Sequence, residues 1–343
     1  MTQLLEIRDR IKELFSKYDI FIIPFFKFLL ALIVLIMINS KLGYMGKLNN
    51  KGIVLIASLA CSFLPTGAIL LFGSLFSMAH VFALSPEVAI VVAVVFLLVY
   101  LLYLRFAPSE SLCIVVTPML FVFHVPYVIP VVMGLVGGPA SALSVVCGVL
   151  VYFTLHVVTQ NAANVSGDLS DILGQIRLII DSLLGNKQML VLAVAFAIVT
   201  IAVYIIRRLP IDHCWTIAII AGAVLNILVI MIGGLVTKAG FSFLGVLFGS
   251  ILAFLVGKVI EFFRFCVDYT RTERVQFEDD EYYYYVKAVP KMSIAARNRK
   301  VKNINRSHRT HSSIRDKFFE EEPVDESEEY GEYEDDYYSD EDN

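Results

Sequence analysis

The chain has 343 residues, of which 57% are hydrophobic and only 17% charged, and its mean hydropathy is +0.72. These values lie well outside the range of soluble globular domains. They exclude most classes of soluble enzyme and predict a protein whose larger part is dissolved in a lipid bilayer. The formal net charge is −4, with a basic and an acidic block near the C-terminus.

The first predicted element is an amphipathic helix in residues 1–18. Apolar residues recur there at helical spacing, at Leu4, Ile7, Ile11 and Leu14, and charged residues occupy the other face. Such a helix lies along a membrane surface with its apolar face toward the lipid.

Residues 19–265 form the predicted transmembrane domain, an all-α polytopic helix bundle. A hydrocarbon core about 30 Å thick requires roughly 20 helical residues per crossing, and this length divides the segment into about eight spans. The predicted spans are Ile20–Asn39, Ile53–Phe76, Val88–Leu104, Leu112–Met133, Ala140–Val158, Met189–Ile206, Cys214–Val236 and Phe241–Phe263.

Two of these spans contain prolines that favour a break or a re-entrant turn. Pro65 lies inside the second span, and Pro118, Pro126 and Pro130 lie inside the fourth. Proline removes a backbone donor and clashes with the preceding turn, so the carbonyl groups that it frees can line a cavity. His124 lies among the second set, and these four prolines and His124 are the candidate pathway residues. The alternative for His124 is a hydrogen-bonded structural side chain between helices.

The proline spacing also indicates an internal duplication. Pro65 and Pro86 are 21 residues apart, as are Pro118 and Pro139. This pattern fits two parallel repeats, each a proline-broken segment followed by a regular span, as in many transporters. Chance similarity between apolar sequences is the alternative.

Sequence motifs argue against an enzyme. The chain contains no GxxxxGK[ST], HExxH or GxSxG motif, and its five cysteines occur singly in or beside the spans. We therefore expect no catalytic residue, no cofactor and no metal site. Any ATP hydrolysis would come from a separate partner ATPase.

A second amphipathic stretch runs from Asp168 to Leu184. Its apolar stripe includes Ile172, Ile176 and Ile180. One interpretation is an interfacial helix that packs on the bundle, and the other is a coupling helix that docks a cytosolic partner. The coupling loop of importer-type permeases carries two alanines after its acid, and this stretch lacks both.

The segment after the last span divides into three zones by composition. Residues 266–290 contain two strand-like runs, Val275–Phe277 and Tyr282–Val289, separated by acidic residues, and predict a small β-hairpin. Residues 291–343 predict a disordered cytoplasmic tail, because they are first strongly basic and then strongly acidic, with few aliphatic residues.

The basic zone is a candidate binding site for anionic lipid headgroups. Each basic charge near such a membrane surface contributes on the order of 1 kcal/mol. The candidate lipid-binding residues are Arg297, Arg299, Lys300, Lys302 and Arg306. Nucleic acid is the less favoured partner.

The distribution of Lys and Arg predicts the orientation. Thirteen of these residues occur from Arg264 onward, which predicts a cytoplasmic C-terminus, and eight crossings would place the N-terminus on the same side. Lys41, Lys47 and Lys51 oppose this assignment, because the first loop would then face outward.

The stretch that opens RFAPSESLCIVVTPMLFVFHVPYVIP and the motif FEDDEYYYYVKAVPK resemble an uncharacterised family of multi-pass membrane proteins from Gram-positive anaerobes. Its members are loosely labelled ABC transporter permeases, so the resemblance implies a bacterial plasma membrane protein. We expect a transporter or permease subunit for an unidentified solute. The alternative is a membrane scaffold whose C-terminal tail recruits cytosolic or envelope partners.

Overall fold

The computed structural model describes residues 2–165, 172–264, 273–278 and 283–288, and these contain 13 α-helices and two β-strands. The chain divides into two compact units, residues 1–295 and 296–343, and all described residues belong to the first. The helices before the middle of the chain are α1 (Thr2–Lys17), α2 (Asp19–Lys41), α3 (Lys51–Phe63), α4 (Gly67–Leu84), α5 (Pro86–Phe106) and α6 (Ser111–Val122). The later ones are α7 (Val128–Val136), α8 (Ser141–Gln160), α9 (Ala162–Val165), α10 (Ile172–Leu184), α11 (Lys187–Arg207), α12 (Cys214–Thr237) and α13 (Phe243–Arg264).

Seven of the described helices are long and apolar enough to cross a membrane: α2, α4, α5, α8, α11, α12 and α13. They are 18 to 24 residues long, and many of their large apolar side chains are exposed, as lipid contact requires. The predicted all-α polytopic bundle is therefore confirmed, and the chain is a multi-pass membrane protein. Six of the eight predicted spans are single continuous helices.

The predicted span Ile53–Phe76 is wrong, because it belongs to two helices. α3 ends at Phe63, α4 begins at Gly67, and Pro65 lies in the turn between them. The break leaves the carbonyl of Leu64 available, and the Lys27 ammonium on α2 donates to it at 3.3 Å. A hydrogen bond to that carbonyl accounts for Lys27, an otherwise costly cation inside an apolar helix.

The predicted span Leu112–Met133 is also wrong as a single crossing. α6 ends at Val122 and α7 begins at Val128. Only Pro126 of the three prolines lies in the break. Pro118 lies inside α6, and Pro130 lies in the first turn of α7, where a helix requires no backbone donor.

The predicted duplication does not extend to the element level. Pro65 lies in a turn between helices, whereas Pro118 lies inside one, and α4 has 18 residues where α7 has 9. The correspondence between Pro86 and Pro139 is closer, because both lie at or just before the start of a long helix.

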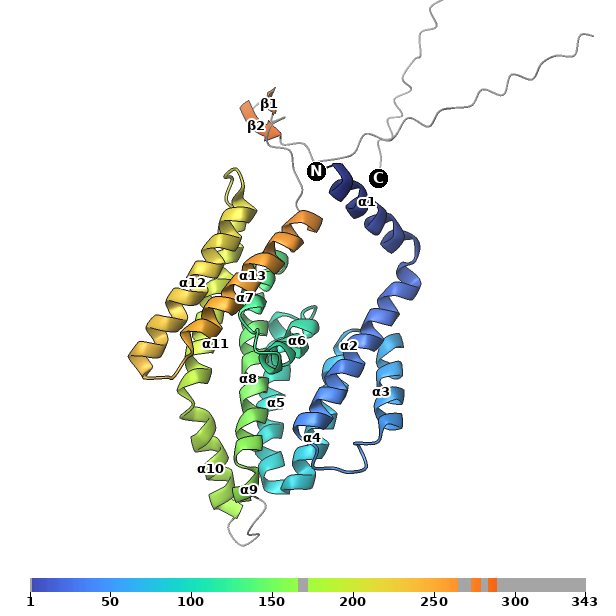
Figure 1. The fold of residues 1–343 in the computed structure, drawn as a ribbon, viewed down its shortest axis with the longest axis vertical. Helices are drawn as coiled ribbons and strands as arrows, with labels where there is room; N and C mark the ends of the chain where they lie inside the picture. Colours follow the sequence, from blue (N-terminus) through green and yellow to red (C-terminus); the bar gives the residue numbers. More distant parts are fainter. Residues whose placement is uncertain (1, 166–171, 265–272, 279–282, 289–343) are drawn as a thin grey trace, which may run out of the picture. The chain divides into compact units, whose positions relative to one another are not determined.

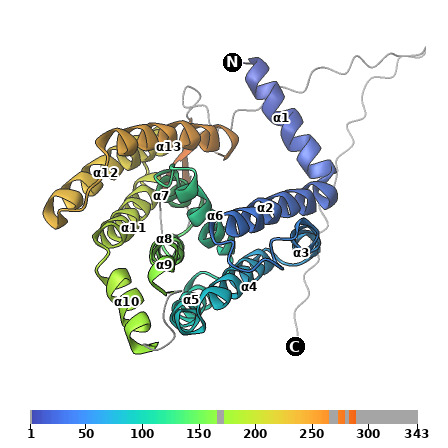
Figure 2. The same ribbon diagram turned by 60° about the horizontal axis from the view of Figure 1, so that its bottom comes forward.

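The helices form two groups with three helices between them (Figures 1 and 2). α2 to α5 lie on one side and α11 to α13 on the other. α6, α7 and α8 lie between the groups, where α6 contacts α4, α8 contacts both α5 and α11, and α7 contacts α11 and α13. Much of the buried core is Val, Ile, Phe and Ala from these interfaces.

Hydrogen bonds between helix ends define two faces of the bundle. We call face A the side on which α2 begins and α13 ends, and face B the opposite side. On face A, Ser111 at the start of α6 bonds Thr66 before α4, and Thr216 of α12 bonds Glu261 of α13. On face B, Gln188 at the start of α11 donates to the carbonyl of Gly240 before α13.

The second amphipathic stretch contains the helix α10, which contacts α5 and α8. Ile179 and Leu183 are buried, and Ser85 before α5 hydrogen-bonds Gln175 at 3.1 Å. α10 follows α8 and precedes α11, so it lies on face B. Packing on the bundle agrees with the interpretation as an interfacial helix.

Two antiparallel strands, β1 (Glu273–Glu278) and β2 (Tyr283–Ala288), form a hairpin within residues 266–290. The register pairs Val275 with Val286. The candidate lipid-binding residues of the basic zone and the acidic zone lie outside the described residues.

Candidate functional site

The helices α6 and α7 form a hairpin that enters and leaves the bundle on the same face. α5 ends on face A, so α6 begins there, and the Glu110 carboxylate before α6 accepts a 2.5 Å hydrogen bond from Ser141 at the start of α8. At the other end of the hairpin, the Arg207 guanidinium at the end of α11 donates to the carbonyls of Leu135 and Gly137. α6 and α7 have 12 and 9 residues, about 18 and 14 Å of helix, too short to cross a bilayer singly.

The tip of this re-entrant hairpin is a helix-ending turn with an unusual residue. The backbone N–H of His124 donates to Phe121 and that of Val125 donates to Leu120, the paired bonds of a Schellman motif. The residue at the left-handed position of that motif is usually glycine, but here it is His124, with φ = 61°. Placing a residue with a Cβ there costs roughly 1–2 kcal/mol.

The hairpin tip is held from the second helix group. Asn226, fully buried in the middle of α12, donates from Nδ2 to the carbonyl of Tyr127 at 2.9 Å. The Tyr127 ring packs edge-on against Phe196 of α11. It also lies against Gly249 of α13, where a Cβ would be 2.1 Å from the ring.

The base of the hairpin is held by charges. The Ser141 hydroxyl that donates to Glu110 also accepts from the backbone N–H of Gly138 at 2.9 Å. The Arg207 guanidinium lies 5.2 Å from the ring centroid of Tyr204 and 5.9 Å from that of Trp215. Both ends of the hairpin are therefore fixed on face A, while its tip projects into the bundle.

A cavity of about 300 Å³ lies beside the hairpin, between α2, α4, α6 and α8. This volume is at the lower end of the range for small-molecule sites. Pro118 and His124 line it. The lining is mainly apolar, from residues such as Val34, Leu70 and Ile114.

Three of the polar residues that line the cavity lie near face B. Lys41 is the last residue of α2, and His156 and Thr159 lie in the last turns of α8, both of which end on face B. The Gln160 side-chain amide forms a hydrogen bond with Nε2 of His156 at 3.0 Å. Tyr152 stacks on the same ring with centroids 5.5 Å apart.

His80 has a structural role near the same face. Its Nδ1 accepts from the backbone N–H of Met45 at 3.1 Å, so Nε2 carries the proton and donates to Oδ1 of Asn39 at 2.7 Å. Asn39 in turn donates to the carbonyl of Leu48. This fully buried histidine joins the loop after α2 to α4. Burial raises the pKa of the Tyr44 hydroxyl in that loop above its ordinary value.

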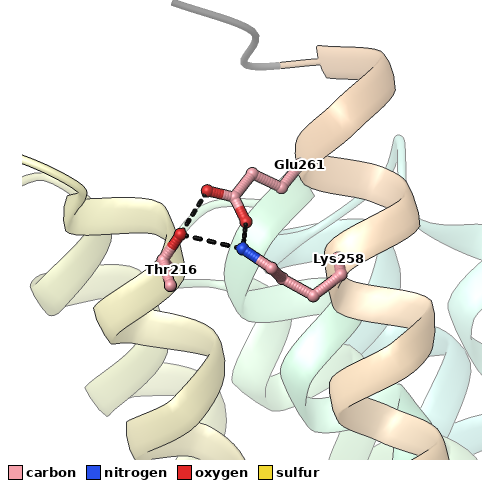
Figure 3. Close-up of polar contacts among 3 residues, drawn as sticks. All are labelled: Thr216, Lys258 and Glu261. Carbon is pink, nitrogen blue, oxygen red and sulfur yellow. Dashed lines mark hydrogen bonds and ion pairs between the residues drawn. The ribbon is translucent and has the colours of Figure 1, made fainter. Parts of the chain in front are cut away.

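A second polar cluster joins α12 and α13 near face A (Figure 3). Lys258 donates from Nζ to Glu261 at 2.7 Å and to the Thr216 hydroxyl at 2.9 Å, and that hydroxyl donates to the other Glu261 oxygen at 2.6 Å. Every oxygen of the carboxylate has a partner. This pairing explains how the two charges are accommodated in the last span, and it lies away from the cavity.

The structure brings together only some of the predicted pathway residues. Pro118 and His124 line the cavity, whereas Pro65, Pro126 and Pro130 do not. Sequence reasoning missed Lys41 and Arg207. The sequence held no specific signal for Lys41, because a lysine at the end of an apolar span is ordinarily an interfacial residue. No sequence signal pairs Arg207 with the end of α7, 70 residues earlier.

The residues that the structure describes contain no group of three or more His, Cys, Asp and Glu side chains that could hold a metal ion. The candidate site therefore consists of the re-entrant hairpin, its strained tip and the adjoining cavity. A comparison of the chain with protein-family models, with curated proteins and with solved structures finds no match.

Proposed function

We propose that this multi-pass membrane protein is a solute permease and that the cavity beside the α6–α7 hairpin is part of its pathway. The observation that carries this proposal is the hairpin itself, two short helices that share one face and meet inside the bundle. Non-helical backbone at membrane depth is tolerated only where protein covers it or where it lines a cavity, and the tip residue His124 does line one.

The strained backbone of His124 supports the same proposal. Residues kept in sparsely populated conformations cluster at ligand-binding and switch positions. An exposed histidine at this turn, beside a cavity and in place of the usual glycine, is such a residue.

The orientation that fits the proposal has face A in the cytoplasm of a bacterial cell. Lys17, Arg105, Arg207 and Arg208 lie at helix ends on face A, and the C-terminal segment with its many basic residues follows α13 on that face. Both the N-terminus and the C-terminus are then cytoplasmic. Lys41, Lys47 and Lys51 face outward, near the mouth of the cavity.

In this orientation α10 lies outside, so it does not serve as a coupling helix for a cytosolic partner. A separate ATPase that powers this permease would dock on the loops of face A. Those loops are short and lie beside the base of the hairpin, where Glu110 and Arg207 are placed.

Cysteine accessibility tests the proposal without knowledge of the solute. In a variant that lacks the five natural cysteines, Ser77→Cys places a thiol in the buried part of the cavity, and Leu75→Cys, two residues earlier on α4, places one toward lipid. The reagent is a membrane-impermeant sulfonate methanethiosulfonate, applied in turn to each side of sealed vesicles.

For a permease, the thiol at position 77 reacts from both sides, because a pathway opens alternately or continuously to each. The thiol at position 75 reacts from neither. Reaction of position 77 from one side only would indicate a closed-ended pocket and would transfer support to a scaffold function of the C-terminal tail.

A further inference from the structure

We infer that the cavity binds a small single-chain amphipathic anion, with its anionic group at Lys41 and its apolar chain between α4 and α6. This inference rests on the proposed function, because it names the substrate class of the same site. The observation behind it is that apolar side chains line one end of the cavity and polar side chains line the other.

The apolar end of the cavity points toward face A. Leu70 lies in the first turn of α4, and Ile114 and Val115 lie in the first turns of α6, two helices that begin on face A. All three side chains are buried, and the hydroxyl groups of the cavity lie farther toward face B. A ligand group in this part gains stability from removal of its apolar surface from water.

The polar end points toward face B and carries a positive charge. Lys41 is seven residues beyond Val34 on α2, which places the ammonium group roughly 10 Å farther toward face B than the apolar part. His156 and Thr159 add hydrogen-bonding groups at the same level. Among the described residues that line the cavity there is no Asp or Glu.

The charge of the cavity therefore favours an anion over a cation or a neutral alcohol. Lys41 takes part in none of the ion pairs found among the described residues, and the neighbouring His156 adds no negative charge. An anionic headgroup would supply a counter-charge to Lys41, which is exposed at the mouth of the cavity. Hydrogen bonds to charged groups are the stronger ones.

The size of the cavity favours one chain over a diacyl lipid. A volume of about 300 Å³, bounded by four helices, holds a small molecule. The buried side chains Leu70 and Ile114 line its apolar end. A medium-chain carboxylate has both the shape and the charge that the cavity fits.

Native mass spectrometry of the full chain, released from detergent micelles, measures binding directly. The probes are decanoate, decanol and decylammonium at matched concentrations. We expect decanoate to bind with one-to-one stoichiometry and at least about tenfold more tightly than the other two probes, as one charge-assisted hydrogen bond provides.

Lys41→Gln should weaken decanoate binding about tenfold and leave decanol binding unchanged. The matched control is Lys47→Gln, because Lys47 is an exposed lysine on the same face that does not line the cavity. Equal effects of the two variants would overturn the inference, since they would show a general surface charge effect. Co-purification of a diacyl phospholipid that Lys41→Gln releases would overturn it too.

A second variant tests the apolar end without altering charge. Gly73 of α4 lines the cavity, and a Cβ there would have no neighbour nearer than 3.7 Å, so the Cβ of Gly73→Leu is accommodated and its larger side chain should take up cavity space. We expect it to abolish one-to-one decanoate binding and to leave the circular dichroism spectrum unchanged. Retained binding would contradict the placement of the chain.

The inference and the proposed function fail separately. If the thiol at position 77 reacts from both sides but decanoate binds no better than decanol, the permease stands and the substrate class is wrong. If decanoate binds as expected but position 77 reacts from one side only, the site is a binding pocket and the permease is wrong.

Discussion

His124 is the residue of the site whose conformation points most directly to a function. It occupies the left-handed position of a Schellman turn, which glycine fills at no steric cost, and its side chain lines the cavity. A sequence selected for stability alone would place glycine there. We therefore expect that the imidazole side chain serves the cavity. The backbone strain that a histidine causes at this position lowers the stability of the protein.

His124→Gly should raise the free energy of unfolding, by up to ~1 kcal/mol, because it relieves the left-handed strain. The measurement is SDS titration in mixed micelles followed by circular dichroism. Phe123→Gly is the matched control: its φ is −80°, so glycine relieves nothing there and stability should fall. A loss of stability in His124→Gly would show that the imidazole has a structural role instead.

At the scale of the element, the α6–α7 hairpin is fixed at both its base and its tip. Arg207 and Glu110 fix the base on face A, and Asn226 with Tyr127 fixes the tip. Small residues on neighbouring helices permit close approach, at Gly148 beside Thr117 and at Gly249 beside the Tyr127 ring. The hairpin is consequently held at both ends between the two helix groups.

Gly249→Ala should destabilise the protein by about 1–3 kcal/mol, as overpacking of a well-packed interface does. The new Cβ would lie 2.1 Å from the Tyr127 ring, and that ring cannot withdraw because Phe196 lies against it. Gly245→Ala on the same helix is the control, since its nearest neighbour would be 3.6 Å away. Thermal unfolding in detergent compares the two variants, and equal melting temperatures would count against the tight packing of the tip.

The sequence predicted which spans are irregular, but it did not predict where the helices within them end and begin. Proline chemistry correctly marked Ile53–Phe76 and Leu112–Met133 as the two irregular spans, because proline disrupts a helix whatever surrounds it. The break points could not be predicted in the same way. Pro118 is tolerated inside α6, where the neighbouring helices cover the segment, and the helix ends instead at Val122, just before the left-handed turn at His124.

At the scale of the whole molecule, the re-entrant hairpin explains how the chain keeps an even number of crossings, with the basic residues near both of its ends on one face. α6 and α7 together make no net crossing, and the short helix α3 runs from face B toward face A as far as the level of Lys27, where the chain turns into α4. The start of α2 and the end of α13 therefore share one face, as the predicted eight crossings required. Lys41, Lys47 and Lys51 of the first loop then lie on face B, opposite the face on which most Lys and Arg residues lie.

Sidedness labelling tests this arrangement in a cysteine-free variant. Ser109→Cys and Gly138→Cys lie just outside the two ends of the hairpin, and Lys47→Cys lies on face B. We expect an impermeant maleimide to label positions 109 and 138 from the same side, and position 47 from the other side only. Labelling of positions 109 and 138 from opposite sides would make α6–α7 a crossing and remove the re-entrant hairpin.

The sequence by itself determined that this is a helical multi-pass membrane protein, because apolar length and the need to satisfy every backbone group in lipid leave few alternatives. It also located the irregular middle. Only the tertiary structure decided that α6 and α7 turn back to one face, that Lys27 and Arg207 bond carbonyls at helix ends far away in the chain, and that His124 lines a cavity with Lys41. These features depend on contacts between helices that are distant in the sequence. The apolar periodicity of one helix does not indicate which helix it packs against.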